Sequence, residues 1–297
     1  MSRTKVILNP YANRWKAQAQ IPAITAAFRQ ADIACDIAVT TRPKQATEEA
    51  AQAVRDGYDV VLAAGGDGTV NEVVNGLAQA AGDGPTHPLA VLPMGTGNDF
   101  SDMAGFPREL AKTVQLVAAG KTRQVDLGLV NGHYFDNNCA VAMEPMVTLE
   151  NIKMTRLSGN VRYVVALGKA LLNLKAWQMR IRWDDGGYDG PVYLLSVCNS
   201  PRTGGLFYMA PQASLTDGLF DFVLMPEVSK LEVLVILARL FAKTHIHHPK
   251  VTYHRTQRLE LTSRPGTPIH ADGEVIAESA ESVTYTILPG KLTILTA

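Results

Sequence analysis

The sequence predicts an α/β fold in two parts, with a parallel sheet in the first part and mainly antiparallel strands in the second. Between residues 4 and 130, short β-branched runs alternate with helical patterns, which is typical of strands joined by helical crossovers. From about Val125 onward, strand patterns separated by turn signals such as Asp217-Gly218 take over. The length of 297 residues is sufficient for two domains that each bury a core. We therefore expect two domains with a boundary near residue 124.

Hydrophobic periodicity assigns the individual elements. Apolar β-branched runs of four to eight residues indicate buried strands, and apolar residues spaced three and four apart indicate helices. In the first part, the predicted strands cover residues 5–8, 33–40, 60–63 and 89–92, and the predicted helices cover residues 15–30, 47–56 and 70–80. In the second part, helical stretches are expected near residues 151–177 and 229–243.

Composition excludes several classes of function. The 28 basic residues balance the 28 acidic ones, so there is no overall positive field that would hold a nucleic acid. Cys35, Cys139 and Cys198 are too few and too far apart for a disulfide framework or a zinc pattern, which favours a reducing cytoplasm. The N-terminus lacks a signal-peptide pattern, and no stretch reaches the roughly 20 apolar residues of a spanning helix. We expect a cytoplasmic protein that contacts a membrane only from its surface.

A glycine-rich loop between a predicted strand and a predicted helix is the strongest functional signal. Residues 64–72 read Ala-Gly-Gly-Asp-Gly-Thr-Val-Asn-Glu. Glycines let the backbone approach a phosphate, and the helix N-terminus presents N–H groups to it. The loop lacks the Lys of a Walker loop, and Asn71 stands where a dinucleotide fingerprint needs a third glycine. Asp67 would repel phosphate unless a divalent cation lies between them or the carboxylate handles a proton. The alternative is a tight turn with an Asp near the helix start.

A second glycine-rich loop, at residues 93–100, follows the next predicted strand. Because loops at the carboxyl ends of parallel strands meet in one crevice, its Gly95 and Gly97 are expected to face the same ligand as the first loop. Asp126 stands in an otherwise apolar strand, where a carboxylate needs a partner or a metal. Both interpretations of Asp126 stay open.

The second part holds three weaker signals. Asp272-Gly273-Glu274 is either a hairpin tip or a turn that presents carboxylates for acid–base chemistry. Residues 211–221 form either a turn or a small Mg²⁺ or Ca²⁺ loop. His245, His247 and His248 are too crowded for a zinc site and are interpreted as a polar loop.

Taken together, these motifs resemble those of the bacterial lipid kinases related to diacylglycerol kinase and sphingosine kinase, in the superfamily of NAD kinase. The resemblance covers nearly the whole chain, with the motifs in the family's order: Asn9-Pro10, Gly65 to Thr69 with Asn71-Glu72, Gly95 to Phe100, Asp126, Ala210-Pro211 through Asp217-Gly218, and Asp272-Gly273-Glu274. It implies an ATP-binding α/β domain at 1–124, completed by 289–297, and a lipid-binding β-sandwich at 125–288. Ala142 and Glu144 depart from the family's Gly and Asp on the lipid side.

The same resemblance implies roles for individual residues. The network that holds catalytic Mg²⁺ would consist of Asp67, Asp99 and Asp126. A structural Mg²⁺ site would be formed by Asp217 with the carbonyls of Ser214 and Leu219. Glu274 would be the general base, with Asp67 as the competing candidate. The ATP contacts are expected from Thr40, Gly65, Gly66, Asp67, Gly68, Thr69, Val70, Gly95, Thr96 and Asn98.

The implied activity is transfer of the γ-phosphoryl group of ATP to a lipid hydroxyl. One alternative is an NAD kinase-like enzyme, but those proteins place their Asn-Glu pair well downstream, whereas Asn71-Glu72 follow the loop directly. A second alternative is a non-catalytic lipid-binding protein. Retention of the Asp and Glu residues argues against it, because a buried carboxylate is costly unless it is used or paired. The acceptor lipid and the formation of a homodimer are left open.

A basic segment indicates where the protein works. Residues 152–182 contain no Asp or Glu but several Lys and Arg, including Arg162, Lys169 and Lys175. Arg162 and Lys169 fall on one helical face, whereas Val161, Val164, Val165 and Leu172 gather on another. This is the pattern of a helix that lies on an anionic bilayer, at the inner face of the membrane. The alternative is a helix packed on the domain with a solvated basic face.

Overall fold

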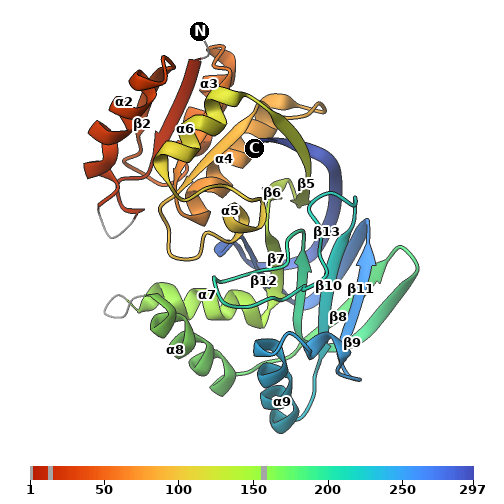
Figure 1. Ribbon diagram of the computed structural model, residues 1–297. Coiled ribbons are helices and arrows are strands. Elements are labelled where there is room, and N and C mark those ends of the chain that lie inside the picture. The colour runs from red at the N-terminus through yellow and green to blue at the C-terminus, as the bar shows by residue number, and fades with distance from the viewer. Residues whose placement is uncertain (1–2, 13–15, 155–158) are drawn as a thin grey trace. The chain divides into compact units, whose positions relative to one another are not determined.

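The computed structural model describes residues 3–12, 16–154 and 159–297. Its contacts divide the chain into two compact units (Figure 1). The first unit comprises Met1–Leu127 with Pro289–Ala297, and the second comprises Gly128–Leu288. The predicted fold class, an α/β unit followed by a β-sandwich-like unit, is confirmed.

A parallel sheet forms the centre of the first unit. Its strands, in spatial order, are β2 (Ala34–Val39), β1 (Arg3–Leu8), β3 (Val60–Gly65), β4 (Leu89–Pro93) and the end of β13 (Glu274–Leu295). Every residue of β3 is buried, as expected for a strand covered on both faces. The carboxyl ends of β1, β3 and β4 therefore lie next to one another at one edge, where the loops that follow them meet.

Within the described residues of the first unit, five α-helices accompany this sheet. They are α2 (Ile21–Gln30), α3 (Gln45–Arg55), α4 (Asp67–Ala81), α5 (Asp99–Met103) and α6 (Leu110–Ala119). Helices α3 and α4 pack closely, because Gly76 leaves no space for a side chain: a Cβ atom there would lie 2.2 Å from the carbonyl oxygen of Thr47. The predicted helix at 15–30 is wrong in its first part. A 3-10 turn covers Gln18–Gln20, and α2 begins only at Ile21, where Pro22 is accommodated in the first turn; Trp15 lies outside the described residues.

The last strand fastens the C-terminal segment to the first unit. Within β13, Ile294 pairs with Leu89 of β4. The side chain of Lys291 is buried, and its ammonium group donates hydrogen bonds to the carbonyl oxygens of Gly82 and Gly84 after α4. Burial lowers the pKa of Lys291.

The second unit is antiparallel. Its strands are the end of β5 (Thr122–Val130), β6 (His133–Phe135), β7 (Asn138–Ala142), β8 (Trp177–Trp183), β9 (Gly186–Cys198), β10 (Phe220–Pro226), β11 (Thr252–Thr256), β12 (Arg258–Ala271) and the first part of β13. Strands β9 and β12 each pair with β8 along one half and with β7 along the other. Strands β7, β9, β8 and β12 consequently form a closed circuit. Its core includes Phe135, Phe220 and Tyr285.

The α-helices described in the second unit are α7 (Met143–Lys153), α8 (Gly159–Leu172) and α9 (Lys230–Phe241). The helical stretch expected near 151–177 is thus two helices, and strand β8 already begins at Trp177. Within the parts of the chain that the structure describes, no helix is long and apolar enough to span a membrane.

The packing of helix α8 bears on the interpretation of the basic segment. It packs on the unit through Ala166, Leu167 and Ala170, so it is a packed helix. Val165 and Leu172, however, are exposed, and so is Lys169. The side chains of Val161, Arg162 and Val164 lie outside the described part of the chain.

Candidate functional site

The two predicted glycine loops meet at one edge of the first unit's sheet. The amide of Met94 donates to the carbonyl of Gly65, and a Cβ atom on Gly95 would lie only 2.6 Å from the Cα atom of Gly66. The contact requires glycine at position 95, and a Cβ atom on Gly66 would be tight, at 3.1 Å from the Cα atom of Gly95. The Asn98 side chain closes the second loop, because it accepts from the Gly95 amide and donates to the Gly95 carbonyl, both at 2.9 Å.

Asp67 joins the two loops. Its carboxylate oxygens accept hydrogen bonds from the backbone amides of Asn98, at 2.8 Å, and Asp99, at 2.6 Å. Asn98 adopts the left-handed backbone conformation with φ of 52°, and α5 begins directly after it. A carboxylate is suited to this position, since it stabilises N–H groups at a helix start. The predicted role of Asp67 in ligand chemistry thus coexists with a structural role that the sequence analysis missed.

Residues that follow β1 and β2 complete this edge of the sheet. The Asn9 side chain donates to the Thr69 hydroxyl at 3.1 Å, which ties the loop after β1 to the first turn of α4. Thr40 is buried after β2, and its amide donates to the carbonyl of Leu8 at 2.9 Å. Thr96 is exposed at the tip of the second loop, and Val70 is buried within α4. The structure therefore gathers the predicted nucleotide-binding residues around the ends of four adjacent strands, β2, β1, β3 and β4.

Glu72 organises the loop beside Thr40. Its carboxylate accepts from the amides of Lys44, at 2.9 Å, and Ala46, at 3.1 Å, at the start of α3. Lys44 has a φ of 65°, so the chain turns sharply there. In the sequence, Asn71-Glu72 stands out only as a motif of the family that the chain resembles. Glu72 lies 28 positions after Lys44 and 26 positions after Ala46, so no local sequence pattern reveals that it caps their amides.

The two remaining acidic candidates in this unit differ. Asp99 is buried in the first turn of α5, next to the Asp67 carboxylate that caps its amide. Asp126 is buried in β5 and accepts a hydrogen bond from the Gly290 amide of β13 at 2.8 Å. This bond gives Asp126 a structural partner, which was one of the two interpretations of its sequence context.

In the second unit, Asp272-Gly273 is a hairpin tip. Asp272 and Gly273 have φ values of 47° and 85°, as in the two-residue turn that joins tightly paired antiparallel strands. The buried Asp272 carboxylate accepts from the amides of residues 136, 137 and 138, so it is fully used in holding that segment. Glu274 begins β13 and is exposed. The turn therefore presents one carboxylate to the solvent, not two.

The loop of Ser214, Asp217 and Leu219 stands before β10. Exposed Asp217 accepts from the Leu219 amide at 3.2 Å, and the Ser214 hydroxyl accepts from the Thr216 amide at 3.3 Å. Buried Asp221 lies close by; one of its oxygens bonds the Tyr253 hydroxyl, and the other has no hydrogen-bond partner among the described residues. Burial raises the pKa of Asp221, and the charge of Asp217 adds to this effect.

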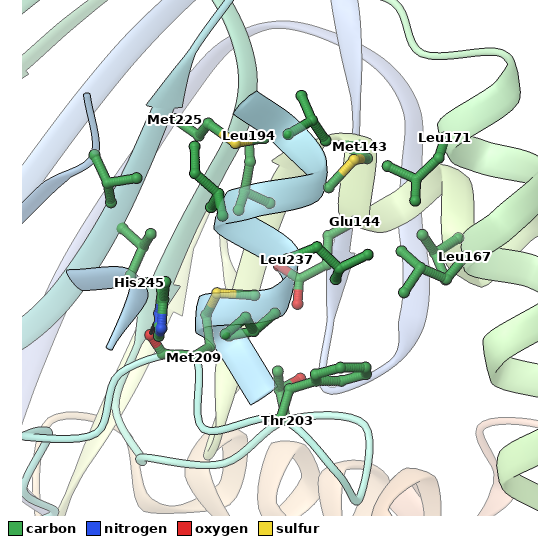
Figure 2. A pocket seen from close by; sticks show the side chains of 17 residues that line it. Met143, Glu144, Leu167, Leu171, Leu194, Thr203, Met209, Met225, Leu237 and His245 are labelled. Carbon is green, nitrogen blue, oxygen red and sulfur yellow. Dashed lines mark hydrogen bonds between the residues drawn. The ribbon is translucent and has the colours of Figure 1, made fainter. Parts of the chain in front are cut away.

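An apolar pocket lies within the second unit. It lies between β9, β10 and the helices α7, α8 and α9 (Figure 2). Its apolar lining includes Leu167, Leu171, Leu194, Phe207, Met225, Val233, Ile236 and Leu240. Figure 2 shows the Glu144 carboxylate among these side chains, with Thr203 at one end and His245 at another. The sequence did not predict this pocket, because segments more than 80 residues apart line it.

Glu144 is the most unusual group in this pocket. It is 5% exposed, and its Oε1 atom accepts from the Asn138 side chain at 3.2 Å. Its Oε2 atom has no hydrogen-bond partner among the described residues and lies 3.8 Å from Nε2 of the buried His270. A buried carboxylate oxygen without a hydrogen bond is costly, so this position is suited to a ligand that donates one.

The interpretation of the histidines as a polar loop is wrong for His245. This side chain is buried at the pocket wall, and its Nε2 atom pairs with the Met209 carbonyl at 2.9 Å. Burial lowers the pKa of His245, which favours the neutral ring. Within the described residues, no group of three or more His, Cys, Asp or Glu side chains is arranged to hold a metal ion by itself.

Known proteins share both units of this chain. Residues 3–130 match the family described as the diacylglycerol kinase catalytic domain, and residues 140–296 match the YegS C-terminal NAD kinase beta sandwich-like domain. A diacylglycerol kinase from Bacillus subtilis is 31% identical over 92% of this chain and 90% of its own length. One from Staphylococcus saprophyticus is 30% identical over 92% of this chain and 88% of its own length.

Solved structures share the fold. A Bacillus anthracis protein superposes with a TM-score of 0.82 at 20% identity, covering 100% of this chain and 95% of that chain. A structure of a diacylglycerol kinase from the same organism gives a TM-score of 0.72 at 20% identity, covering 100% and 97%. The match of both units and the 30% identity over nearly the whole chain place this protein in the diacylglycerol kinase catalytic-domain family, as a kinase of the lipid kinase type that acts on an alcohol acceptor.

Proposed function

We propose that the protein transfers the γ-phosphoryl group of ATP to the hydroxyl of a lipid, with a diacylglycerol-like molecule as the acceptor. The observation that carries this proposal is the meeting of the two glycine loops through Asp67 at the carboxyl edge of the parallel sheet. Crevices at this edge are where α/β sheets bind nucleotides. The diacylglycerol kinases of Bacillus subtilis and Staphylococcus saprophyticus supply the acceptor class.

The ATP phosphates bind at the first turn of α4 in this proposal. Backbone amides of Gly66, Gly68 and Thr69 lie at the positive end of a 15-residue helix, which attracts phosphate oxygens. These backbone groups replace the Lys of a Walker loop. Phosphoryl transfer needs positioning and charge neutralisation more than covalent help, and such groups supply both.

The carboxylates of the first unit fit a magnesium ion. Asp67 and Asp99 are adjacent at the glycine loops, and carboxylate oxygens are the ligands that Mg²⁺ prefers. With Asp126, they would hold the ion largely through water. A bound Mg²⁺ would neutralise charge on the phosphates during transfer.

Glu274 is the proposed general base. It is exposed at the start of β13, so an acceptor hydroxyl can reach its carboxylate from the solvent side. Both oxygens of Asp67 accept backbone hydrogen bonds that join the two glycine loops. Asp67 is assigned to the organisation of the loops and of the Mg²⁺-nucleotide.

The apolar pocket is the proposed site for the lipid. Its lining is suited to acyl chains, and Glu144 with its unpaired Oε2 atom is suited to a hydroxyl donor of the headgroup region. We place the reaction at the surface of the inner membrane leaflet, where such lipids reside.

A screen of acceptors tests the proposal. The purified protein is incubated with radiolabelled ATP and Mg²⁺, with diacylglycerol, a sphingoid base, phosphatidylglycerol or NAD as the acceptor. Label is expected in the diacylglycerol fraction and is expected to disappear when Mg²⁺ is chelated. Label in NAD alone would support the small-molecule alternative, and ATP binding without any labelled product would support a non-catalytic lipid-binding protein.

A stabilising cation at Asp217 is a separate prediction. The exposed Asp217 carboxylate and the backbone carbonyls of Ser214 and Leu219 supply oxygen atoms, which are the ligands that Mg²⁺ prefers, and they would hold the cation. Added Mg²⁺ is expected to raise the melting temperature, with a gain of about 2.7 kcal/mol at 100 times the Kd. Asp217→Ala is expected to abolish this gain, whereas Asp185→Ala, at a different exposed turn, should keep it. Activity lost at unchanged stability in Asp217→Ala would place Asp217 in the reaction instead.

A further inference from the structure

Helix α9 is apolar on two opposite faces. One face, formed by Val233, Ile236, Leu237 and Leu240, lines the apolar pocket. The other face carries Leu231, Leu234, Val235 and Ala238, at the spacing of three, four and seven residues that defines one side of a helix. A helix that is apolar all round is normally buried all round.

The outer face of α9 is not buried by the protein. Leu231 is 77% exposed, Leu234 56%, Val235 48% and Phe241 58%. Eight large apolar side chains are exposed in the described part of the chain, and seven of them belong to α9, to α8 or to the loop that carries Leu206. The same segments supply walls of the apolar pocket. Exposed apolar side chains gathered in this way mark a binding surface.

The helix is formed before any partner arrives. The Ser229 hydroxyl accepts from the Glu232 amide at 3.3 Å, which caps the helix start, and it donates to the Glu232 carboxylate at 3.3 Å. Leu237 and Leu240 pack on the cluster of Ala166 and Leu167 in α8. The exposed stripe is therefore held rigidly.

The charges around the stripe are positive. Lys230 and Arg239 flank it on opposite sides of the helix, and Lys243 follows the C-terminal end. Glu232 is the one acidic residue of α9, and it pairs with Lys250 at 2.8 Å. An apolar stripe between basic side chains is typical of helices that lie in the interface of an anionic bilayer.

A second copy of the chain fits this surface less well. A 12-residue helix is about 18 Å long, so one face covers a small fraction of the roughly 800 Å² per partner that a stable interface needs. Two-fold pairing along α9 would also bring Lys230 and Arg239 of both copies together. A bilayer is unlimited in area, is apolar inside and is anionic at its surface, and it contains molecules that match the pocket behind the helix.

We propose that α9 inserts its outer face into the interface of an anionic bilayer and forms the wall between the membrane and the lipid pocket. Leu231, Leu234 and Val235 would lie among the acyl chains, with Lys230 and Arg239 at the headgroups. A lipid would pass from the bilayer to the pocket alongside this helix. That a lipid passes along α9 into the pocket rests on the proposed function. The binding of α9 to a bilayer does not, because it is measured without catalysis.

Vesicle sedimentation tests the insertion. The wild type is expected to bind vesicles of phosphatidylcholine with phosphatidylglycerol, and the triple variant Leu231→Ser/Leu234→Ser/Val235→Ser to bind about 100-fold more weakly, since each apolar side chain contributes to transfer from water. Tyr11→Ser removes an exposed apolar side chain of the first unit and should bind as the wild type does. Lys230→Gln/Arg239→Gln should weaken binding to these vesicles and reduce its salt dependence.

Depth measurements and the oligomeric state complete the test. The Leu234→Trp variant should show fluorescence that brominated acyl chains quench beyond the quenching of the wild type. Unchanged vesicle binding in the triple variant, or a wild type that does not bind, overturns the proposal. A wild-type dimer that the triple variant converts to a monomer, with vesicle binding unchanged, would assign the stripe to a second copy of the chain.

Activity separates this proposal from the proposed function. The triple variant should phosphorylate a short-chain diacylglycerol, dissolved below its micelle concentration, as fast as the wild type, but should lose activity on long-chain diacylglycerol in vesicles. If the wild type binds vesicles through α9 and phosphorylates no lipid, the proposed function fails and the membrane surface stands. If it phosphorylates both lipids and the triple variant is unimpaired on vesicles, the surface is wrong and the function stands.

Discussion

Replacing Glu274 with glutamine is expected to lower the rate of phosphoryl transfer by a factor of about 10² to 10⁴ and to leave the affinity for ATP unchanged. Glutamine has nearly the same size as glutamate but does not take up the proton of the acceptor hydroxyl. Glu274 is exposed at the start of β13, and the nucleotide loops belong to the other unit of the chain. The variant should therefore fold and bind nucleotide normally. Single-turnover rates and ATP titrations by calorimetry measure the two quantities separately.

A matched control is present in the same strand. Glu278 is also an exposed glutamate of β13, four residues further along, so Glu278→Gln makes the same chemical change on the same element. This control should retain the full rate. A Glu274→Gln variant with wild-type activity would exclude Glu274 as the base. Equal loss of ATP affinity in Glu274→Gln and in Asp67→Asn would show that the roles of these residues are assigned wrongly.

The parts of the fold that follow from local patterns were predictable. Strand β3 and the loop after it are a buried apolar run followed by glycines, and both properties are visible within ten residues of sequence. The meeting of this loop with the loop of Gly95 followed from the parallel order of the strands. The start of α2 was not predicted correctly, because the periodicity continues through residues 16–20 although the chain there forms a 3-10 turn.

The parts that depend on distant segments were not predictable. The pocket of the second unit needs β9, β10, α7, α8 and α9 to converge, and nothing in any one segment specifies that convergence. The capping of residues 44 and 46 by Glu72 likewise depends on the packing of α3 against α4. The two-sided apolar pattern of α9, in contrast, is present in the sequence Lys-Leu-Glu-Val-Leu-Val-Ile-Leu-Ala-Arg-Leu-Phe, and its outer stripe was missed.

Asp67→Asn is expected to weaken the binding of Mg²⁺-ATP by about 10- to 100-fold, and to lower the rate of transfer as well. Both oxygens of Asp67 accept backbone hydrogen bonds, from Asn98 and Asp99. An asparagine side chain has one acceptor oxygen, so its NH₂ group would face one of these amides as a second donor. A hydrogen bond to a charged group contributes about 1.5–3 kcal/mol. If the loss of one such bond loosens the second glycine loop, the same free energy is lost from nucleotide binding, which corresponds to the expected decrease in affinity.

The two possible roles of Asp67, holding the second loop and binding the ion, lead to different expected results for Asp67→Asn. If Asp67 acts by holding the loop, ATP affinity should fall even without Mg²⁺, since the glycine loops bind the phosphates directly. If it acts only through the ion, the affinity for metal-free ATP should stay the same or rise, because a negative charge near the phosphates is removed. Asp102→Asn is the matched control, because Asp102 lies on α5, the helix whose first amide Asp67 caps, and its carboxylate pairs with Arg108 at 2.6 Å. Calorimetric titrations of all three proteins with ATP, with and without Mg²⁺, distinguish the two roles, and unchanged affinity under both conditions would remove Asp67 from the nucleotide site.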